Sequence, residues 1–255
     1  MDPDLSSNRV TGWDSVFYVP AFVTEEEEDY LIRKIQETPQ NKWKQLANRR
    51  LQIWGGDLTP KNVLIPQAMP PFLVEYPNLI SRLKATGAFN SSPHQQPNHV
   101  ILNEYLAGQG IMPHEDGPSY HPVVATLSLG SHTVMHYYRY APSDPAEGGG
   151  AGRAIEPAPA LSLLLEPRSL VITSSALYSA HLHGISAVEE DTFTGPGDSK
   201  DSHGFCVANA NLLVGAREKS VVEGGGALRR GTRYSLTCRD VSRVAKIGTG
   251  TAFGR

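Results

Sequence analysis

Two histidines and an aspartate, spread over two distant segments, are the residues of this chain best suited to bind a metal ion. His114 and Asp116 are separated by one residue, so in an extended or turn backbone both side chains project to the same side. His183 follows far downstream, at the end of the apolar, β-prone run 177–184. Two histidines and a carboxylate hold a non-haem Fe(II) on one face and leave the opposite face open. The pattern therefore indicates oxygen-activating iron chemistry.

Two histidines are candidates for the third metal ligand. His181 lies two residues before His183 and would share its face in a strand. A buried histidine without a partner is costly, whereas a metal satisfies one ring nitrogen. Gly184 leaves backbone room for a crowded metal centre, which favours His183 over His181. The short spacing of the upstream pair also arises by chance, in which case that pair belongs to a solvated turn.

Polar and less polar residues alternate along a segment near the C-terminus. In a strand, one face would carry Arg233, Ser235, Thr237 and Arg239, and the other Tyr234, Leu236 and Cys238. A guanidinium fork binds a carboxylate with two parallel hydrogen bonds. The segment is therefore suited to binding an acidic co-substrate, although the arginines could instead pair with acidic residues of the protein.

An earlier strand supplies further polar groups for such a co-substrate. Asn103 and Tyr105 share one face of the predicted strand 98–106. We expect Arg233 to hold one end of a small dicarboxylate together with Asn103 and Tyr105, while the other end chelates the iron. Arg239 is expected to pair with Asp116, because ligating carboxylates usually need an outer partner.

The elements that must position these residues are mostly short strands. After a strand at 15–23, a capping box formed by Thr24 and Glu27 predicts a helix to about residue 37. A second helix is predicted near 70–83, and a loop at 86–97. Further strands are predicted at 98–106, 122–129, 132–140, 161–166, 168–174, 177–183 and 232–240. This order is typical of a sandwich or a double-sheet barrel. The Gly-rich segments 141–160 and 189–228 are predicted to be flexible insertions.

Composition narrows the class of protein. The chain has 255 residues, enough for one substantial core with an N-terminal extension. Its net charge of −3 argues against global electrostatic capture by nucleic acid, so any such contact needs a local basic patch. The two cysteines form no CxxC pair, which argues against a disulfide framework or a thiolate zinc site. No signal-like or membrane-spanning apolar run is present, so a cytoplasmic or nuclear location is expected.

One basic patch lies at 41–56, where the cations have no acidic neighbour and two tryptophans lie among them. These cations are Lys42, Lys44, Arg49 and Arg50. They could contact phosphates while Trp54 stacks on an unpaired or flipped base. The alternative is an amphipathic loop, with both tryptophans in the core and the cations extended along its surface.

Four further segments, together with the metal and arginine motifs, resemble the AlkB family of Fe(II)/2-oxoglutarate-dependent dioxygenases. They read LQIWGG at 51–56, GIMPHEDGP at 110–118, SLGSHTV at 128–134 and LLLEPRSL at 163–170. The second is quite specific, and the resemblance covers most of 16–188 and 228–243. It implies a mainly β protein with flanking helices (α+β), built as a double-stranded β-helix, or jelly roll. In that arrangement 1–97 is an N-terminal helical and lid extension, 98–243 the core and 244–255 a tail.

The resemblance also implies roles for individual residues. The iron ligands would be His114, Asp116 and His183. The 2-oxoglutarate contacts would be Asn103, Tyr105, Arg233 and Ser235, supported from outside by Thr237 and Arg239. Ser235 departs from the family pattern, because many relatives have asparagine there and this chain supplies a hydroxyl in place of an amide.

The activity implied is oxidation by Fe(II), with 2-oxoglutarate and O2 as co-substrates. The expected reaction is oxidative demethylation of alkylated DNA or RNA, bound as a single strand or a flipped base by a lid at 42–54. The protein is expected to act as a monomer without a membrane partner. Two alternatives remain: a hydroxylase or demethylase of protein side chains on the same fold, and a catalytically weak nucleic-acid-binding protein.

Overall fold

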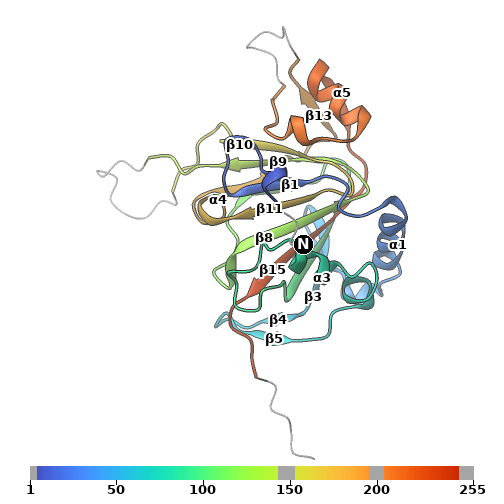
Figure 1. Cartoon of the computed structure of the whole chain (residues 1–255), viewed down its shortest axis with the longest axis vertical. Helices are drawn as coiled ribbons and strands as arrows, with labels where there is room; N and C mark the ends of the chain where they lie inside the picture. Colours follow the sequence, from blue (N-terminus) through green and yellow to red (C-terminus); the bar gives the residue numbers. More distant parts are fainter. Residues whose placement is uncertain (1–4, 143–152, 196–203, 247–255) are drawn as a thin grey trace, which may run out of the picture.

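Two antiparallel sheets form the framework of the computed structural model, which describes residues 5–142, 153–195 and 204–246. The larger sheet contains, in spatial order, β1 (Val16–Val19), β11 (Leu170–Ser174), β8 (Tyr120–Leu129), β15 (Arg233–Val241), β6 (His99–Tyr105), β3 (Arg49–Trp54) and β2 (Lys44–Leu46). The smaller contains β10 (Leu161–Leu165), β9 (Thr133–Tyr138), β12 (Leu182–Ile185) and β7 (Ile111–His114). The predicted class, mainly β with flanking helices in a jelly-roll arrangement, is confirmed (Figure 1).

Three helices pack on the outer face of the larger sheet: α1 (Glu25–Gln36), α2 (Pro71–Val74) and α3 (Leu79–Ala85) (Figure 1). The predicted capping box is present, because the Glu27 amide donates to Thr24 Oγ1 at 3.2 Å and the Thr24 amide donates to Glu27 Oε2 at 2.9 Å. The single helix predicted at 70–83 is two short helices. Pro77, which lacks an amide hydrogen, lies between them.

The helices and the larger sheet share one hydrophobic core. From β15 this core takes Tyr234, Leu236 and Cys238, the less polar set of the predicted alternation. The polar set therefore faces the space between the two sheets. A second core lies between the smaller sheet, β1 and β11, and it includes Val134, Leu163 and Val171.

The prediction of a strand at 177–183 is wrong. Helix α4 (Ser175–Ala180) occupies most of it, His181 follows as the C-terminal cap, and β12 begins only at Leu182. A short run such as Ala-Leu-Tyr-Ser-Ala has too few residues for its apolar period to separate a strand from a helical turn. His181 and His183 consequently do not share one strand face.

The segment at 41–56 is a hairpin that extends the larger sheet. Strands β2 and β3 pair with each other, and β3 also pairs with β6. A small ribbon follows, made of β4 (Gly56–Leu58) and β5 (Leu64–Pro66). Because β1 and β3 belong to the same sheet as β6, that sheet runs across the boundary predicted at residue 97.

The described parts of the predicted insertion 189–228 contain regular structure. Strand β13 (Glu190–Phe193) pairs with β14 (Gly226–Arg229), and α5 (Ala216–Gly224) lies beside them at the top of Figure 1. The flexibility predicted for this segment and for 141–160 stays a prediction, and residues 143–152 and the tail 247–255 lie outside the described residues. Within the described part of the chain, no helix is both long and apolar enough to cross a membrane.

Candidate active site

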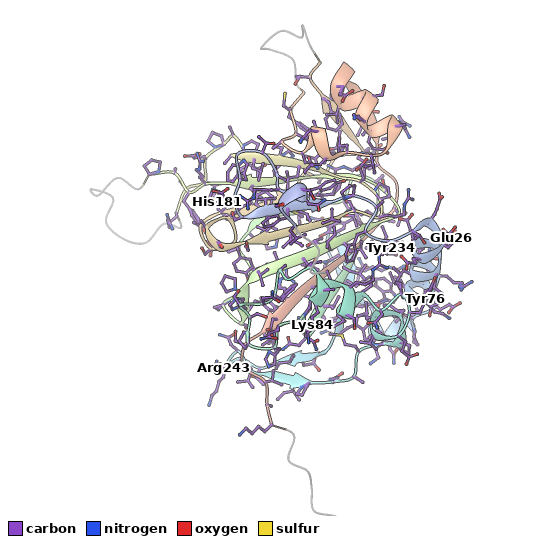
Figure 2. All side chains as sticks on the ribbon, in the orientation of Figure 1. Glu26, Tyr76, Lys84, His181, Tyr234 and Arg243 are labelled. Atoms are coloured by element: carbon purple, nitrogen blue, oxygen red, sulfur yellow. The ribbon has the colours of Figure 1, made fainter. Side chains whose placement is uncertain are left out.

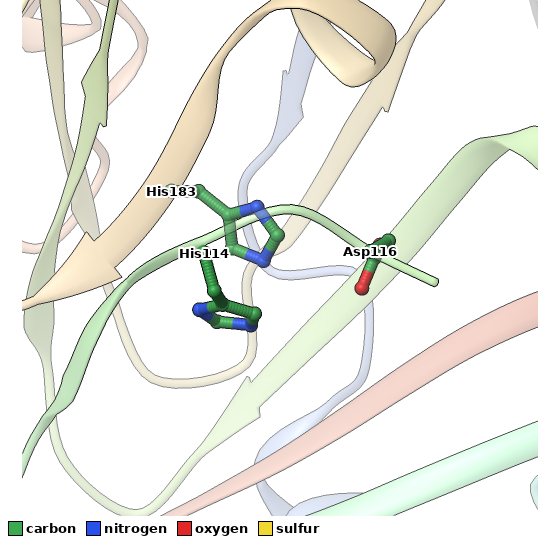
Figure 3. A group of neighbouring side chains, drawn as sticks. All are labelled: His114, Asp116 and His183. Atoms are coloured by element: carbon green, nitrogen blue, oxygen red, sulfur yellow. The ribbon is translucent and has the colours of Figure 1, made fainter. Parts of the chain in front are cut away.

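The three predicted metal ligands converge from two segments of the chain. His183 on β12 pairs directly with His114 on β7, and Asp116 lies just beyond the end of β7. One ligand atom from each residue lies within 4.8 Å of the other two. The imidazole rings are 4.4 Å apart between centroids, and the Asp116 carboxylate lies to one side of them (Figure 3). This donor set and spacing fit one metal ion.

Hydrogen bonds and burial favour the protonation states that metal binding needs. His114 Nδ1 donates to the Met112 carbonyl oxygen at 2.9 Å, which leaves Nε2 as the ligand atom. Burial lowers the pKa of His183 to about 4, so this imidazole is neutral near pH 7. Burial by itself would raise the pKa of Asp116, but the charge and hydrogen bonds of Arg239 outweigh it and hold that pKa below its usual value. A neutral imidazole and an ionised carboxylate are the forms that bind metal.

His181, the alternative third ligand, caps the end of α4 (Figure 2) and is not a member of the metal-binding cluster. Its Nδ1 is 3.4 Å from the Ala176 carbonyl oxygen, and its ring meets Trp13 edge-on at 5.9 Å. It lines a different surface hollow, together with Tyr140 and Glu115. The geometry therefore favours His183.

A cavity of about 660 Å³, including its open mouth, adjoins the two histidines between the sheets. It is lined by five of the six predicted co-substrate and supporting residues, namely Asn103, Tyr105, Ser235, Thr237 and Arg239. The register of β15 and β6 brings the polar groups together, because Ser235 lies opposite Asn103 and Arg233 lies opposite Tyr105.

Several residues that line this cavity belong to no motif recognised in the sequence. Tyr137 donates to or accepts from Thr173 at 2.8 Å, whereas the buried Tyr178 hydroxyl has no partner among the described residues. Tyr137 lies on β9, a predicted strand, and alternation along that strand could have found it. Tyr178 could not be found in this way, because its segment is a helix where a strand was predicted.

Arg233 is a buried cation without a carboxylate partner in the described chain. Its side chain is 3% exposed, and burial lowers its pKa to about 10. Nη2 donates to Ser128 Oγ at 2.9 Å, while Nη1 has no partner. The guanidinium adjoins Tyr105 in a small cavity that shares Tyr105 and Ile185 with the larger cavity beside the two histidines. A buried, incompletely paired guanidinium is costly unless an anion binds it, so the site fits one carboxylate of 2-oxoglutarate.

The two arginines of the hairpin face opposite sides of the sheet. Arg49 lies beside Asn103 and lines an outer hollow with His114 and Asp116. Arg50 points the other way, where it binds Glu104 through two hydrogen bonds of 2.6 and 2.7 Å. Side chains alternate between the two faces of a strand, so the consecutive residues Arg49 and Arg50 cannot both border the outer hollow.

The predicted base-stacking role of Trp54 does not fit its packing, since Trp54 shares the face of Arg50. Its indole packs edge-on against Phe72 at 6.0 Å and donates to Gln52 Oε1 at 2.9 Å. Lys42 lies over its ring at 5.9 Å, and Lys44 is exposed. Trp54 and Arg50 therefore agree with the alternative prediction, in which the tryptophan packs in the core and the cation extends along its surface. Arg49 instead borders the metal site.

The fold and this site define a dioxygenase that uses Fe(II), 2-oxoglutarate and O2. The sequence matches the 2OG-Fe(II) oxygenase superfamily over residues 15–239, and the chain belongs to that superfamily. It is 40% identical over 232 residues to the probable RNA/DNA demethylase ALKBH6 of Danio rerio, covering 91% of this chain and 88% of that protein. The predicted resemblance to the AlkB family is thereby confirmed.

Two further comparisons are more distant. The uncharacterized protein L905 of Acanthamoeba polyphaga mimivirus is 28% identical over 197 residues, which cover 76% of this chain and 84% of that protein. The solved structure of OsALKBH1 superimposes with a TM-score of 0.48 at 14% identity, covering 89% of this chain and 98% of that one.

Proposed function

We propose that this dioxygenase removes alkyl groups from RNA or DNA by oxidation. In the proposed assignment, His114, Asp116 and His183 hold Fe(II). The co-substrate 2-oxoglutarate is held by Asn103, Tyr105, Arg233 and Ser235. The observation that carries the proposal is that a cluster of metal-binding geometry and a buried, incompletely paired arginine border adjoining cavities.

The bound iron would supply the oxidation, in which 2-oxoglutarate and O2 become succinate and CO2 and a substrate methyl group is hydroxylated. The residues of the chain would bind, orient and exclude water. Arg233 would fix the far carboxylate, and Arg239 would keep Asp116 ionised and aligned. Apolar side chains such as Val124 and Leu177 line the cavity and would limit the entry of water. A hydroxymethyl group on a base nitrogen then breaks down to formaldehyde and the unmodified base.

Two observations support a nucleic acid as the substrate: the charge around the outer hollow, and the similarity to the Danio rerio protein. An outer hollow of about 900 Å³ adjoins His114 and Asp116 and is bordered by Arg49, and the exposed Lys44 lies on the neighbouring strand. Such cations suit phosphate groups of a single strand or a flipped nucleotide. The relative that is 40% identical is described as a probable RNA/DNA demethylase. A monomeric enzyme in the cytoplasm or nucleus is part of the same proposal.

The test is to incubate the Fe(II)-loaded protein with 2-oxoglutarate and single-stranded oligonucleotides that carry N-methylated bases. Above the slow formation of succinate that occurs without an oligonucleotide, succinate and formaldehyde should form in equal amounts, and Asp116→Ala should abolish both. Lys44→Glu should reduce formaldehyde release while the slower, substrate-independent formation of succinate persists. Turnover that persists in Asp116→Ala would contradict the metal assignment, and oxidation of peptides but not oligonucleotides would make a protein the substrate.

A further inference from the structure

The hairpin that borders the outer hollow also touches the proposed 2-oxoglutarate site. Arg49 Nε donates to Asn103 Oδ1 at 2.9 Å, from β3 to the neighbouring strand β6. Asn103 is 8% exposed and lines both the inner cavity and the outer hollow. Arg49 is half-buried, and it is the hairpin cation that lines this hollow. The contact therefore connects the substrate side of the site to the co-substrate side.

This contact decides which end of the Asn103 amide is available to a ligand. A guanidinium has only donors, so the oxygen of the amide must face Arg49. The Asn103 Nδ2 group makes no hydrogen bond to the described chain, so its two donors remain free for the cavity that Asn103 lines. An amide without such an anchor can rotate and present its oxygen to an incoming carboxylate, which would repel it.

We propose that Arg49 is a positioning residue that fixes the Asn103 amide with its donors toward 2-oxoglutarate. The inference rests on the proposed assignment of Asn103 to the co-substrate site. Arg49 acts through Asn103 and makes no contact of its own with the dicarboxylate. The hydrogen bond joins a charged donor to a largely buried acceptor, the type that contributes most among protein hydrogen bonds.

Arg50 provides a matched comparison for the neighbouring position. It pairs across the sheet with Glu104, the residue after Asn103, but on the opposite face. Its guanidinium also stacks on Trp43 at 4.1 Å. A conservative change at Arg50 therefore alters the same hairpin and the same pair of strands without touching the Asn103 amide.

The experiment measures 2-oxoglutarate affinity by calorimetry on the full chain, with Mn(II) in place of iron so that no turnover occurs. The proteins compared are wild type, Arg49→Met, Asn103→Ala, the double variant and Arg50→Lys. Arg49→Met should weaken binding roughly tenfold, the loss of about one charged hydrogen bond. The double variant should bind no more weakly than Asn103→Ala alone, because Arg49 has nothing left to position. Arg50→Lys should match wild type.

Turnover and stability separate this role from a structural one. In turnover without an oligonucleotide, where contacts to the nucleic acid play no part, Arg49→Met should raise the KM for 2-oxoglutarate much more than it lowers kcat, with a thermal midpoint close to that of wild type. Losses that add up in the double variant would overturn the proposal, because Arg49 would then act directly on the dicarboxylate. Unchanged affinity in Arg49→Met would overturn it as well. If wild type itself did not bind 2-oxoglutarate, the proposed function would fail instead.

Discussion

Arg239 binds both carboxylate oxygens of Asp116, with Nε 2.9 Å from Oδ2 and Nη2 2.5 Å from Oδ1. Both side chains are 6% exposed. Each carboxylate oxygen has two lone pairs, so the same oxygens can accept these hydrogen bonds and still face His114 and His183. The pair therefore fixes the direction of Asp116 before any metal binds.

Removing this arginine should affect both stability and metal binding. Arg239→Met leaves a buried carboxylate without its partner, and this change should lower the free energy of unfolding by roughly 3–5 kcal/mol. The pKa of Asp116 should rise, so metal affinity should fall as the pH is lowered, and more steeply than in wild type. Chemical denaturation and Fe(II) titration at several pH values measure both effects. Arg229→Met, at a side chain that is 84% exposed, is the control and should change neither.

The two candidate histidines should separate in a metal-binding assay. His183→Ala removes a ligand atom from a cluster in which all three lie within 4.8 Å of one another, so it should abolish stoichiometric Fe(II) binding. His181→Ala should retain it, because His181 lies at the end of α4 beside Trp13. Metal content after anaerobic loading and gel filtration gives the answer. Full binding by His183→Ala would refute the ligand assignment.

Arg233 should show opposite effects on stability with and without co-substrate. Without it, Arg233→Met should be more stable than wild type, because a buried and incompletely paired guanidinium is removed. With Mn(II) and 2-oxoglutarate at about one hundred times Kd, wild type should gain roughly 5–10 °C in Tm, and the variant should gain little. Thermal unfolding with and without the co-substrate tests this. An equal gain in both proteins would show that Arg233 does not hold the dicarboxylate.

His99 should make stability depend on pH in the mildly acid range. Burial, with a contribution from Arg239, lowers its pKa to about 4 in the folded protein, against 6.5 for an ordinary histidine. Between these values the unfolded chain binds more protons than the folded one, so stability is retained above pH 6.5 and lost as the pH falls towards 4. The contribution of His99 is up to roughly 3 kcal/mol. His99→Gln should flatten the pH dependence of unfolding over this window, and an unchanged slope would count against the assignment.

Trp54 should contribute to the stability of the protein, and Lys44 to the binding of nucleic acid. Trp54→Ala should destabilise the protein by about 2 kcal/mol, because the indole packs against Phe72 and the helix-side core. Lys44→Ala should leave stability unchanged, since Lys44 is exposed, and should weaken oligonucleotide binding. Denaturation and fluorescence anisotropy with a labelled oligonucleotide distinguish the two. A stacking role for Trp54 would require the reverse pattern.

Much of the fold followed from local pattern. The capping box at Thr24 and Glu27, the alternation along β15 and the class of two packed sheets are properties of neighbouring residues, and all three are present in the structure. The strand predicted at 177–183 failed because Ala176, Leu177 and Tyr178 suit a short helix as well as a strand, and only packing selects between them.

For the site, the sequence alone determined the types of residue and the faces that they share within one strand. It could predict the pair His114 and Asp116, and it favoured His183 over His181 only because Gly184 follows His183. Only the tertiary structure shows the geometric basis for that preference, because His183 pairs with His114 across β12 and β7. It also turned Arg49 toward Asn103 and Arg50 toward Glu104. The physical reason is that strand register and the sheet face that each side chain meets are set by contacts between distant segments, and these contacts leave no periodic signal along the chain.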